Sequence, residues 1–249
     1  MSYIKQKLII TVLIFSTALF AANSSYAEID MPEFKLTPYG GIDVGMQHIG
    51  FKAGYGDNLF EKHLPKGNIF VGLKFNDYFG VEGGYESTIQ KTKNVTLGAN
   101  DTYLGMTTGI GGPFNMNPGE NLKASTKIKI SGWHFGITTE YPIYVNNVQN
   151  SLSLTSYLGL KKTRINLSST TLIVAGVVDN GIDLLNHDNK KTLFKLSAGL
   201  QYFINNNFGL KISGSWENTS KFQPYNTKNT LRASLKNSIS YSLGFLFKE

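Results

Sequence analysis

From about residue 36 onward, apolar and polar residues alternate along the chain with a period of two. This period is typical of β-strands with one apolar and one polar face, because successive side chains point to opposite sides. The clearest strand, residues 239–247, interleaves Ile239, Tyr241, Leu243, Phe245 and Phe247 with Ser240, Ser242, Gly244 and Leu246. Similar alternation predicts strands near residues 40–46, 69–75, 79–86, 128–137, 152–161, 195–202 and 208–217. We therefore expect an all-β, antiparallel fold of eight strands.

The strand near residues 128–137 changes phase. Ile128 and Ile130 have one parity, whereas Trp133 and Phe135 have the other. A β-bulge at Ser131-Gly132 would bring both sets to one face, because one extra residue shifts the register. The long segment 89–125 has room for a further hairpin, which would raise the strand count from eight to ten.

Long and short connections alternate between these strands. The long ones are residues 49–67, 87–126, 163–191 and 218–237, whereas Asn76-Asp77 and Asn205-Asn206-Asn207 begin a repeated tight-turn pattern. Transmembrane barrels combine short periplasmic turns with long external loops in this way. The pair Asn180-Gly181 between two apolar runs predicts a hairpin that extends the fifth and sixth strands beyond the membrane.

A soluble, lipocalin-like barrel also alternates, but its polar face meets water. Here the polar face carries many glycines, which weaken water-facing strands without benefit, whereas a narrow lumen needs small residues beside long ones. The apolar face carries bulky groups such as Trp133, Trp216 and Tyr85, as expected of a lipid-facing surface. Only 16% of the residues are charged, well below the usual level of about 25%. These features favour an up-and-down transmembrane β-barrel in residues 28–249.

The first 27 residues predict a secretory signal peptide. Lys5 and Lys7 precede an apolar run that ends at Phe20, and the small residues Ser25 and Ala27 flank Tyr26 at the expected cleavage site. The run is shorter than the roughly 20 apolar residues of a membrane-spanning helix. We expect cleavage after Ala27. The chain has no cysteine, which excludes a disulfide scaffold, and an exported chain of this kind fits the Gram-negative envelope.

Several strand starts and the final strand carry a family resemblance. Tyr39-Gly40-Gly41, Phe79-Gly80-Val81-Glu82-Gly83-Gly84-Tyr85, Phe208-Gly209-Leu210 and the closing segment 240–247 resemble the outer-membrane β-barrel family. This group includes the OmpA transmembrane domain, OmpX and the opacity-type surface proteins. The resemblance implies a location in the bacterial outer membrane. It also implies that the terminal aromatic residue, Phe247, acts as a recognition signal for the barrel assembly machinery.

If the polar faces line the lumen, charged residues of both signs meet there. An unpaired buried charge is very costly, so we expect these groups to pair. We expect Glu82 and Lys211 to belong to one such network. The network is either a structural polar core or a gate whose salt bridges switch partners. Its predicted members are Asp43, Lys74, Glu82, Glu86, Lys129, Lys161, Lys195, Lys211 and Glu217, with Lys129 placed by the bulge.

Catalytic and metal-binding motifs are poorly supported. His134 is the only histidine in a predicted strand, and bulge parity assigns it to the polar face as a hydrogen-bonded lumen residue. Ser131 lies close by, but no sequence signature supports a nucleophile–base pair. The segment Gly109–Pro113 lacks the lysine and the strand-to-helix context of a phosphate cradle. We therefore expect neither an enzyme nor a bound cofactor or metal ion.

The predicted function is a surface scaffold whose external loops mediate structural or adhesive contacts with a host or envelope protein. The alternative is a small gated channel lined by the charged lumen, and an outer-membrane lipid or peptide hydrolase ranks third. Lys221, Lys228, Arg232 and Lys236 make the last long connection basic, which favours contact with anionic outer-membrane lipids including lipopolysaccharide. Export makes nucleic acid an implausible partner.

Overall fold

The computed structural model describes residues 34–98, 100–107, 119–146, 150–174, 177–178, 186–223 and 233–249. The expected cleavage site at Ala27, the Asn180-Gly181 turn, Lys228 and Arg232 lie outside the described residues. Residues Lys35–Glu249 belong to one unit, which carries all the elements considered below. Within the described residues, no helix is both long and apolar enough to cross a membrane.

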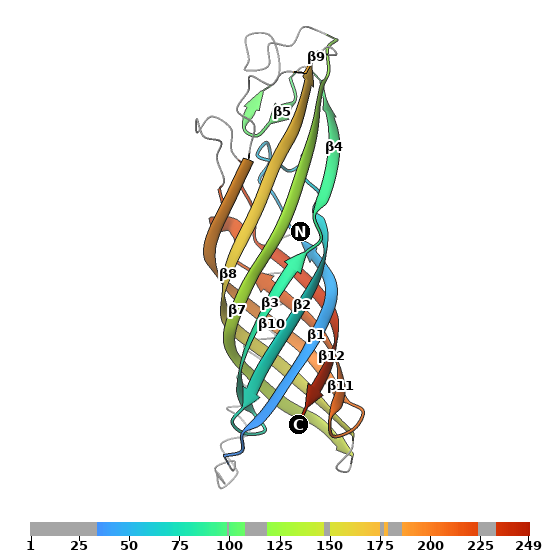
Figure 1. Ribbon diagram of the computed structural model, residues 1–249, viewed down its shortest axis with the longest axis vertical. Helices are drawn as coiled ribbons and strands as arrows, with labels where there is room; N and C mark the ends of the chain where they lie inside the picture. Colours follow the sequence, from blue (N-terminus) through green and yellow to red (C-terminus); the bar gives the residue numbers. More distant parts are fainter. Residues whose placement is uncertain are drawn as a thin grey trace. The chain divides into compact units, whose positions relative to one another are not determined.

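Eight antiparallel strands close into a ring (Figure 1). Strands that follow one another along the chain are neighbours in the ring, and pairing of the last strand with the first closes it, from Tyr39 opposite Lys248 to His48 opposite Ile239. The predicted all-β, up-and-down barrel is therefore confirmed. The ring strands are β1 (Thr37–His48), β2 (His63–Lys74), β3 (Phe79–Thr88), β7 (Leu122–Asn146), β8 (Asn150–Val174), β10 (Asn186–Phe203), β11 (Phe208–Glu217) and β12 (Ser238–Lys248).

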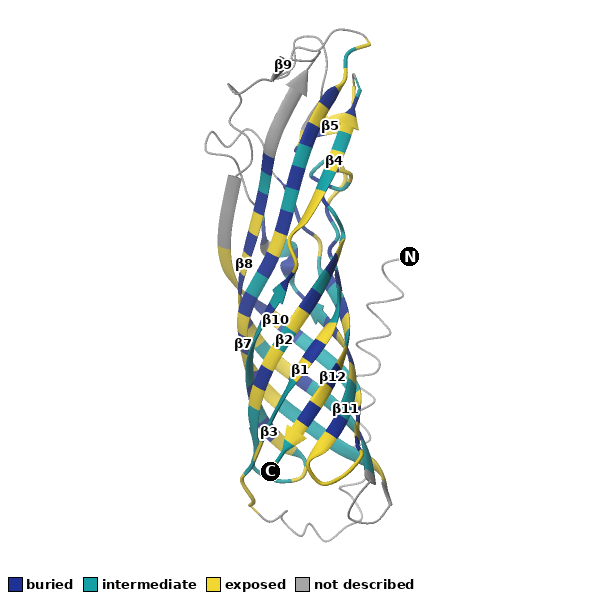
Figure 2. Ribbon diagram, turned by 45° about the vertical axis from the view of Figure 1, so that its right-hand side comes forward, coloured by how far each residue is buried: buried dark blue, intermediate teal, exposed yellow. Residues whose placement is uncertain are grey.

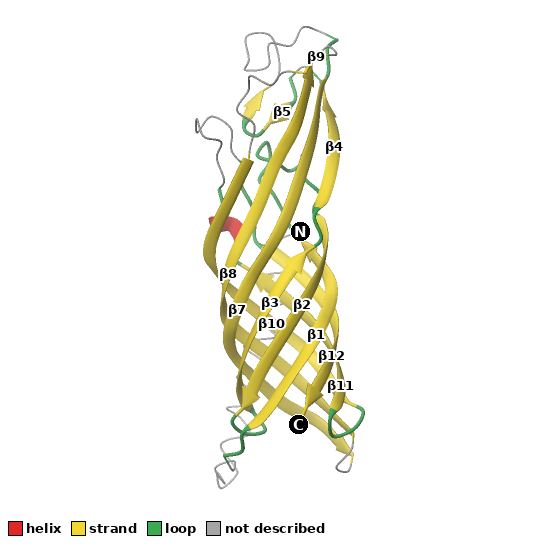
Figure 3. Ribbon diagram, in the orientation of Figure 1, coloured by secondary structure: helices red, strands yellow, loops and turns green. Residues whose placement is uncertain are grey.

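The remaining short elements lie outside the ring (Figure 3). Strand β4 (Lys91–Leu97) continues the pairing along β7 beyond the end of β3, and β9 (Val177–Val178) pairs with the end of β8. Strands β5 (Thr102–Tyr103) and β6 (Met106–Thr107) form a separate two-stranded hairpin, and η1 (Thr219–Lys221) is a 3-10 turn. Segment 89–125 thus contains the additional hairpin considered above, but the ring keeps eight strands.

The two repeated tight turns share one local mechanism. The side-chain oxygen of Asn76 accepts hydrogen bonds from the backbone N–H groups of Tyr78 and Phe79, both at 2.8 Å. Asn205 accepts equivalent bonds from Asn207 and Phe208, at 2.9 and 2.8 Å. Asparagine side chains favour turns because they can bond the backbone two or three residues ahead. The repeat therefore places tight turns at β2–β3 and β10–β11, at the same end of the barrel (Figure 1).

The outer face of the ring is apolar and the inner face is polar, as predicted for a transmembrane barrel. Exposed and buried residues alternate along the lower halves of the strands (Figure 2). Large apolar side chains such as Trp133, Val71 and Phe245 point outward and are 63–69% exposed, whereas Glu82 and Lys161 are buried inside. A soluble barrel would have the opposite arrangement. An exposed apolar surface of this extent fits a lipid environment.

Strand β7 keeps its phase where a bulge was expected. Its register with β8 runs without a break from Thr126 to Pro142, and the irregularities lie at Ser125/Thr126 and Pro142/Tyr144. Ile128 and Ile130 are each only 1% exposed, although Trp133 and Phe135 point outward. The predicted bulge at Ser131-Gly132 is therefore wrong, because the inside of the barrel changes from polar to apolar at this height. As a consequence, Lys129 points outward and is exposed.

The upper strands extend far beyond the apolar band. Strands β7 and β8 have 25 residues each, or about 80 Å of chain at ~3.3 Å per residue. A lipid-facing apolar band is only about 25 Å tall. Residues 63–67, 91–97, 122–126, 163–174 and 186–191, which we assigned to long connections, are strands instead. The predicted extension of the fifth and sixth strands is confirmed by β8 and β10.

An apolar cluster, here called the upper core, fills the barrel where these strands extend past the band. Its buried members are Ile49, Phe51, Leu59, Phe60, Leu64, Leu97, Tyr103, Leu104, Leu122, Ala124, Ile128, Ile130, Ile165, Leu167, Leu193, Phe222, Ala233 and Leu235. The Tyr103 hydroxyl donates to Ser169 Oγ at 2.7 Å and anchors the β5–β6 hairpin in this cluster. Burial raises the pKa of the Tyr103 phenol, so it stays protonated and able to donate.

Candidate functional site

Five charged side chains meet inside the barrel, directly below the upper core. They are Lys66 on β2, Glu86 on β3, Lys161 on β8, Lys195 on β10 and Glu217 on β11, here called the charge network. All five are buried, and Lys161 is 0% exposed. The strand alternation directs each of them inward, because each follows the parity of the lumen face.

Each carboxylate of the charge network contacts more than one donor. Lys195 Nζ donates to Glu86 Oε2 at 2.6 Å, and Lys161 bridges Glu86 and Glu217, with 2.9 Å to Glu217 Oε1. Lys66 Nζ lies 3.6 Å from Glu86 Oε2 and donates to Ser240 Oγ at 2.9 Å. Buried ion pairs persist only when additional hydrogen bonds satisfy the remaining lone pairs and protons. The network meets this requirement because Glu86 accepts from lysines on two strands, and Glu217 accepts from Lys161 and, at 3.4 Å, from Gln47 Nε2.

A hydrogen-bonded chain of four residues crosses the lumen beside the network. Asn68 Nδ2 donates to Asp43 Oδ2 at 3.0 Å, and Asn68 Oδ1 lies 3.0 Å from His134 Nε2. The Tyr157 hydroxyl lies 3.2 Å from His134 Nδ1. Because the Asn68 oxygen only accepts, Nε2 carries the proton and Nδ1 accepts from Tyr157. His134 therefore lies inside the lumen as a hydrogen-bonded residue, as predicted. The predicted bulge, on which that assignment depended, is not needed to bring it there.

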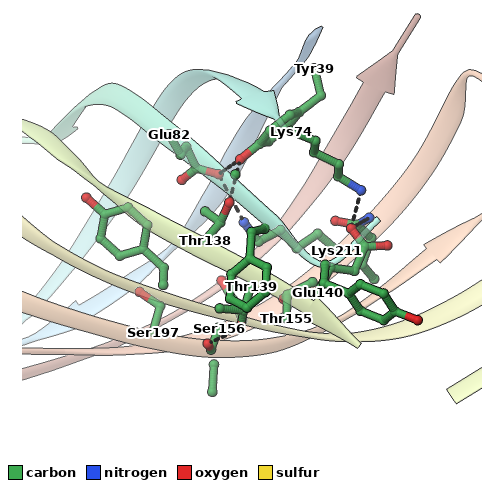
Figure 4. A pocket seen from close by; sticks show the side chains of 17 residues that line it. Tyr39, Lys74, Glu82, Thr138, Thr139, Glu140, Thr155, Ser156, Ser197 and Lys211 are labelled. Atoms are coloured by element: carbon green, nitrogen blue, oxygen red, sulfur yellow. Dashed lines mark hydrogen bonds and ion pairs between the residues drawn. The ribbon is translucent and has the colours of Figure 1, made fainter. Parts of the chain in front are cut away.

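A second set of charges lies lower in the lumen, next to Tyr78 and Phe79 of the β2–β3 turn. Figure 4 shows these side chains around one pocket. Lys74 pairs with Glu140, and Lys211 Nζ lies 3.8 Å from Glu82 Oε2. The Tyr39 hydroxyl donates to Glu82 Oε2 at 3.3 Å. These groups line a cavity of about 30 Å³, which has room for about one or two water molecules. We call it the lower cavity.

Glycines create the space that these long side chains occupy. A Cβ at Gly72 would lie 2.2 Å from the Tyr39 ring, and one at Gly159 would lie 2.3 Å from the Tyr157 hydroxyl. A Cβ at Gly244 would lie 1.9 Å from Asp43 Oδ1. The glycines on the polar face therefore serve lumen packing, as the sequence argument requires for a narrow barrel.

The structure brings together most of the residues predicted for the lumen. Asp43, Lys74, Glu82, Glu86, Lys161, Lys195, Lys211 and Glu217 point inward, whereas Lys129 lies on the outer wall. Three inward charges were missed. Lys66 lies in a predicted connection, and Glu140 lies past the expected end of its strand, although it shares parity with His134. Lys248 lies past the expected end of the last strand, with the inward parity of β12, and its Nζ is 4.0 Å from the centroid of the Phe203 ring. The lumen charges named here are therefore five carboxylates and six lysines.

The remaining candidate residues are distributed over the barrel. Phe247 is exposed on β12, and its ring lies 5.5 Å from that of Phe208. His134 is not the only strand histidine, because His48 and His63 end β1 and begin β2, with ring centroids 4.7 Å apart. Among the described residues, no group of three or more His, Cys, Asp or Glu side chains could hold a metal ion.

The Glu82–Lys211 pair gives a testable coupling. Charge reversal of either residue, Glu82→Lys or Lys211→Glu, should lower the melting temperature of the refolded barrel, because it places like charges together in a partly buried site. The double reversal should recover part of this loss. Thermal melts followed by the gel shift between folded and unfolded barrel measure all three variants. Strictly additive effects would show that the two side chains do not interact.

The upper core closes the lumen above the charge network. The next inward positions above Lys66 and Lys195 are Leu64 and Leu193, and Ile130 and Ile165, which are paired across β7 and β8, belong to the same apolar cluster. Each of these four side chains is at most 1% exposed. In the described part of the barrel, a cluster of buried apolar side chains therefore packs above the paired charges.

Comparisons with known proteins found one matching family and several similar solved structures. A family model described as "Outer membrane protein beta-barrel domain" matches residues 11–247. No curated protein sequence matches the chain. Solved structures similar to it include Ail, the attachment invasion locus protein of Yersinia pestis, in complex with the heparin analogue sucrose octasulfate (14% identity, 87% of this chain and 99% of that chain, TM-score 0.38). Neisserial surface protein A (12%, 85% and 96%, TM-score 0.40) and the N-terminal β-barrel domain of Pseudomonas aeruginosa OprF (14%, 85% and 97%, TM-score 0.32) are also similar.

Proposed function

The chain belongs to the outer-membrane protein β-barrel family and is a protein of the bacterial outer membrane; from that premise we propose that it is a closed scaffold that presents its long upper strands to surface partners. One observation carries the proposal. Ion pairs occupy the lumen and the upper core packs above them, which supports a structural use of the interior. What the barrel then offers is its outer surface and its strands beyond the lipid band.

The proposed orientation follows from the connection lengths. Outer-membrane barrels carry short turns on the periplasmic side and longer segments outside. The β2–β3 and β10–β11 turns would then face the periplasm, and the extended parts of β4, β7, β8 and β10 would stand outside the cell. Such a rigid sheet suits contact with a host or envelope protein, since binding surfaces are commonly carried on segments held by a rigid scaffold.

We propose a binding role in preference to catalysis. His134, the strand histidine considered as a general base, lies in the lumen with both ring nitrogens bonded to Asn68 and Tyr157. A base must come within hydrogen-bond reach of a substrate proton. His134 is buried below the upper core, so this arrangement supports a structural role.

Two further partners belong to the proposal. Phe247 is the last outward aromatic residue of β12, the strand that pairs with β1 to close the barrel. This exposed position suits recognition by the barrel assembly machinery. The outer-leaflet glycolipid, lipopolysaccharide, is proposed as the lipid partner. Lys236 of the last connection is exposed, as contact with anionic head groups requires.

Single-channel recording tests the closed scaffold against the gated-channel alternative. Mature protein refolded to a heat-modifiable gel position and inserted into a planar bilayer should give no stable current steps, because paired charges and the upper core block the lumen. Stable ion-dependent steps that shift with Lys74→Gln or Glu82→Gln would overturn the proposal. Recovery of the folded gel band from the bilayer sample controls for protein that failed to insert.

A further inference from the structure

Two histidines face each other on the outer wall of the barrel, where β1 ends and β2 begins. The two strands are neighbours in the ring (Figure 1), and His48 lies directly opposite His63 in their register. The ring centroids are 4.7 Å apart, and the ring planes are tilted by 47°. His48 is partly exposed and His63 is exposed, and both continue the outward rows that hold Val44 and Ile69 lower on the same strands. The pair is therefore accessible from outside the barrel.

The backbone hydrogen bonds hold the two histidines close together. Ile49 N donates to Lys62 O at 2.8 Å, so the ladder between the strands continues one residue beyond the pair. Because Ile49 and Lys62 are hydrogen-bonded to each other, His48 and His63 form the neighbouring pair without direct backbone bonds. The Cα atoms of such a pair are about 4.5 Å apart, and its side chains approach more closely than those of a hydrogen-bonded pair. The contact between the rings thus follows from the strand register.

The spacing of the two rings suits nitrogens that share one metal ion. Neutral imidazole is the commonest metal ligand among protein side chains, and it suits Zn²⁺, Cu²⁺ and Ni²⁺. With nitrogen–metal distances of about 2.0–2.1 Å and a nearly tetrahedral angle at the ion, two such rings have centroids about 5 Å apart. The observed separation of 4.7 Å is close to that value. Small rotations of the two side chains are then enough to direct one nitrogen of each ring to a common ion.

The surroundings of the pair select the kind of ion. Glu61 Oε1 accepts from the backbone N–H of His63 at 3.4 Å, whereas the exposed Lys236 is held near Gly50, two residues beyond His48. In the part of the chain that the structure describes, no third His, Cys, Asp or Glu completes a group able to hold a metal ion. Ca²⁺ and Mg²⁺ prefer oxygen ligands, which this pair does not supply. Two imidazoles with water in the remaining positions favour a late transition metal, and Cu²⁺ binds such ligands more tightly than Ni²⁺ or Zn²⁺.

We propose that His48 and His63 bind one divalent late transition-metal ion, Cu²⁺ most tightly, on the outer wall of the barrel. The ion links the last residue of β1 to the first residue of β2. It thereby joins the two ends of segment 49–62, which contributes Phe51 and Phe60 to the upper core. The sequence predicted no metal ligand because this segment separates the two histidines along the chain, and only the pairing of β1 with β2 brings them together.

Copper binding to the untagged, refolded protein tests the site. The native chain, His48→Ala and His63→Ala are compared with the control His187→Ala, which removes a histidine from β10. Each protein is refolded in phosphatidylcholine vesicles and titrated with CuCl₂ at neutral pH against a weak competing chelator. Electron paramagnetic resonance measures the bound Cu²⁺ and the number of nitrogens that coordinate it. Parallel titrations use ZnCl₂ and MgCl₂, and the heat-modifiable gel band confirms that each variant is folded.

We expect the native chain and the control to bind one Cu²⁺ through two imidazole nitrogens, and to bind Zn²⁺ more weakly and Mg²⁺ not at all. His48→Ala and His63→Ala should each weaken Cu²⁺ binding at least about tenfold, since even the loss of a group that only supports a ligand costs 10–100-fold in metal affinity. Unchanged affinity in either of these variants, as for an ion held by the chain's free amino group, would overturn the site. An equal loss in His187→Ala, or a native chain that binds no Cu²⁺, would overturn it as well.

Discussion

Replacement of Lys161 by Met is expected to lower the free energy of unfolding by about 3–5 kcal/mol, the typical cost of removing one partner from a buried ion pair. Lys161 is fully buried and contacts both Glu86 and Glu217, so its loss leaves two carboxylates short of a cation. Methionine approximates the volume of the lysine stem, so the effect reports charge more than a cavity. Urea unfolding from phosphatidylcholine vesicles, followed by tryptophan fluorescence, measures it.

Two further variants separate the charge effect from general damage. Lys162→Met changes the next residue on β8, which points outward, and should alter stability by no more than about 0.5 kcal/mol in vesicles without anionic lipid. Lys161→Met/Glu217→Gln should be more stable than Lys161→Met alone, because one uncompensated carboxylate is neutralised. Equal stability of Lys161→Met and native protein would refute the network as a stabilising element.

Replacement of Phe60 by Ala is expected to loosen the upper part of the barrel while the membrane band stays folded. Phe60 is fully buried in the upper core and stacks on Phe51, with ring centroids 5.3 Å apart. A Phe→Ala change in a core costs about 3–5 kcal/mol. A small separate cluster of Phe70, Phe203 and Leu246 lies in the lower lumen, and the charge network divides it from the upper core. We therefore expect the loss to remain local.

Limited proteolysis with and without heating shows whether the upper part of the barrel loosens while the membrane band stays folded. Phe60→Ala should expose new cleavage sites in residues 49–62 and 91–107 at a temperature where the heat-modifiable band persists. Phe60→Leu keeps most of the apolar volume and should show a much smaller effect. Simultaneous loss of the folded band and of protease resistance would show instead that the barrel unfolds as one cooperative unit.

Local alternation was sufficient to predict the wall of the barrel. In β12, Tyr241, Leu243 and Phe245 point outward because strand geometry sends every second side chain to the same face. The repeated Asn76 and Asn205 turns were predictable for the same reason, since their hydrogen bonds span only two or three residues. Eight of the nine residues named for the lumen follow from this parity.

The odd or even position of a residue in a strand shows which face of the strand it belongs to. It does not show whether that face contacts lipid or protein at a given height along the barrel. Ile128 and Ile130 suggested a bulge because apolar residues were assumed to face lipid throughout. In the structure they face the upper core, whose other members come from segments distant in sequence, such as Phe60 and Leu235. The same assumption placed Lys129 in the lumen, and missed Lys66 and Glu140, which lie beyond the strand ends that we predicted.

The sequence by itself thus determined the strand type, the number of ring strands, the tight turns and the set of side chains available to each face, because these depend on neighbours one to three residues apart. The tertiary structure alone decided which charges pair, where the lumen changes from polar to apolar, and how His48 and His63 come to face each other across β1 and β2. Those features depend on strand register and on contacts between residues as distant as Glu86 and Lys195, which no local pattern encodes.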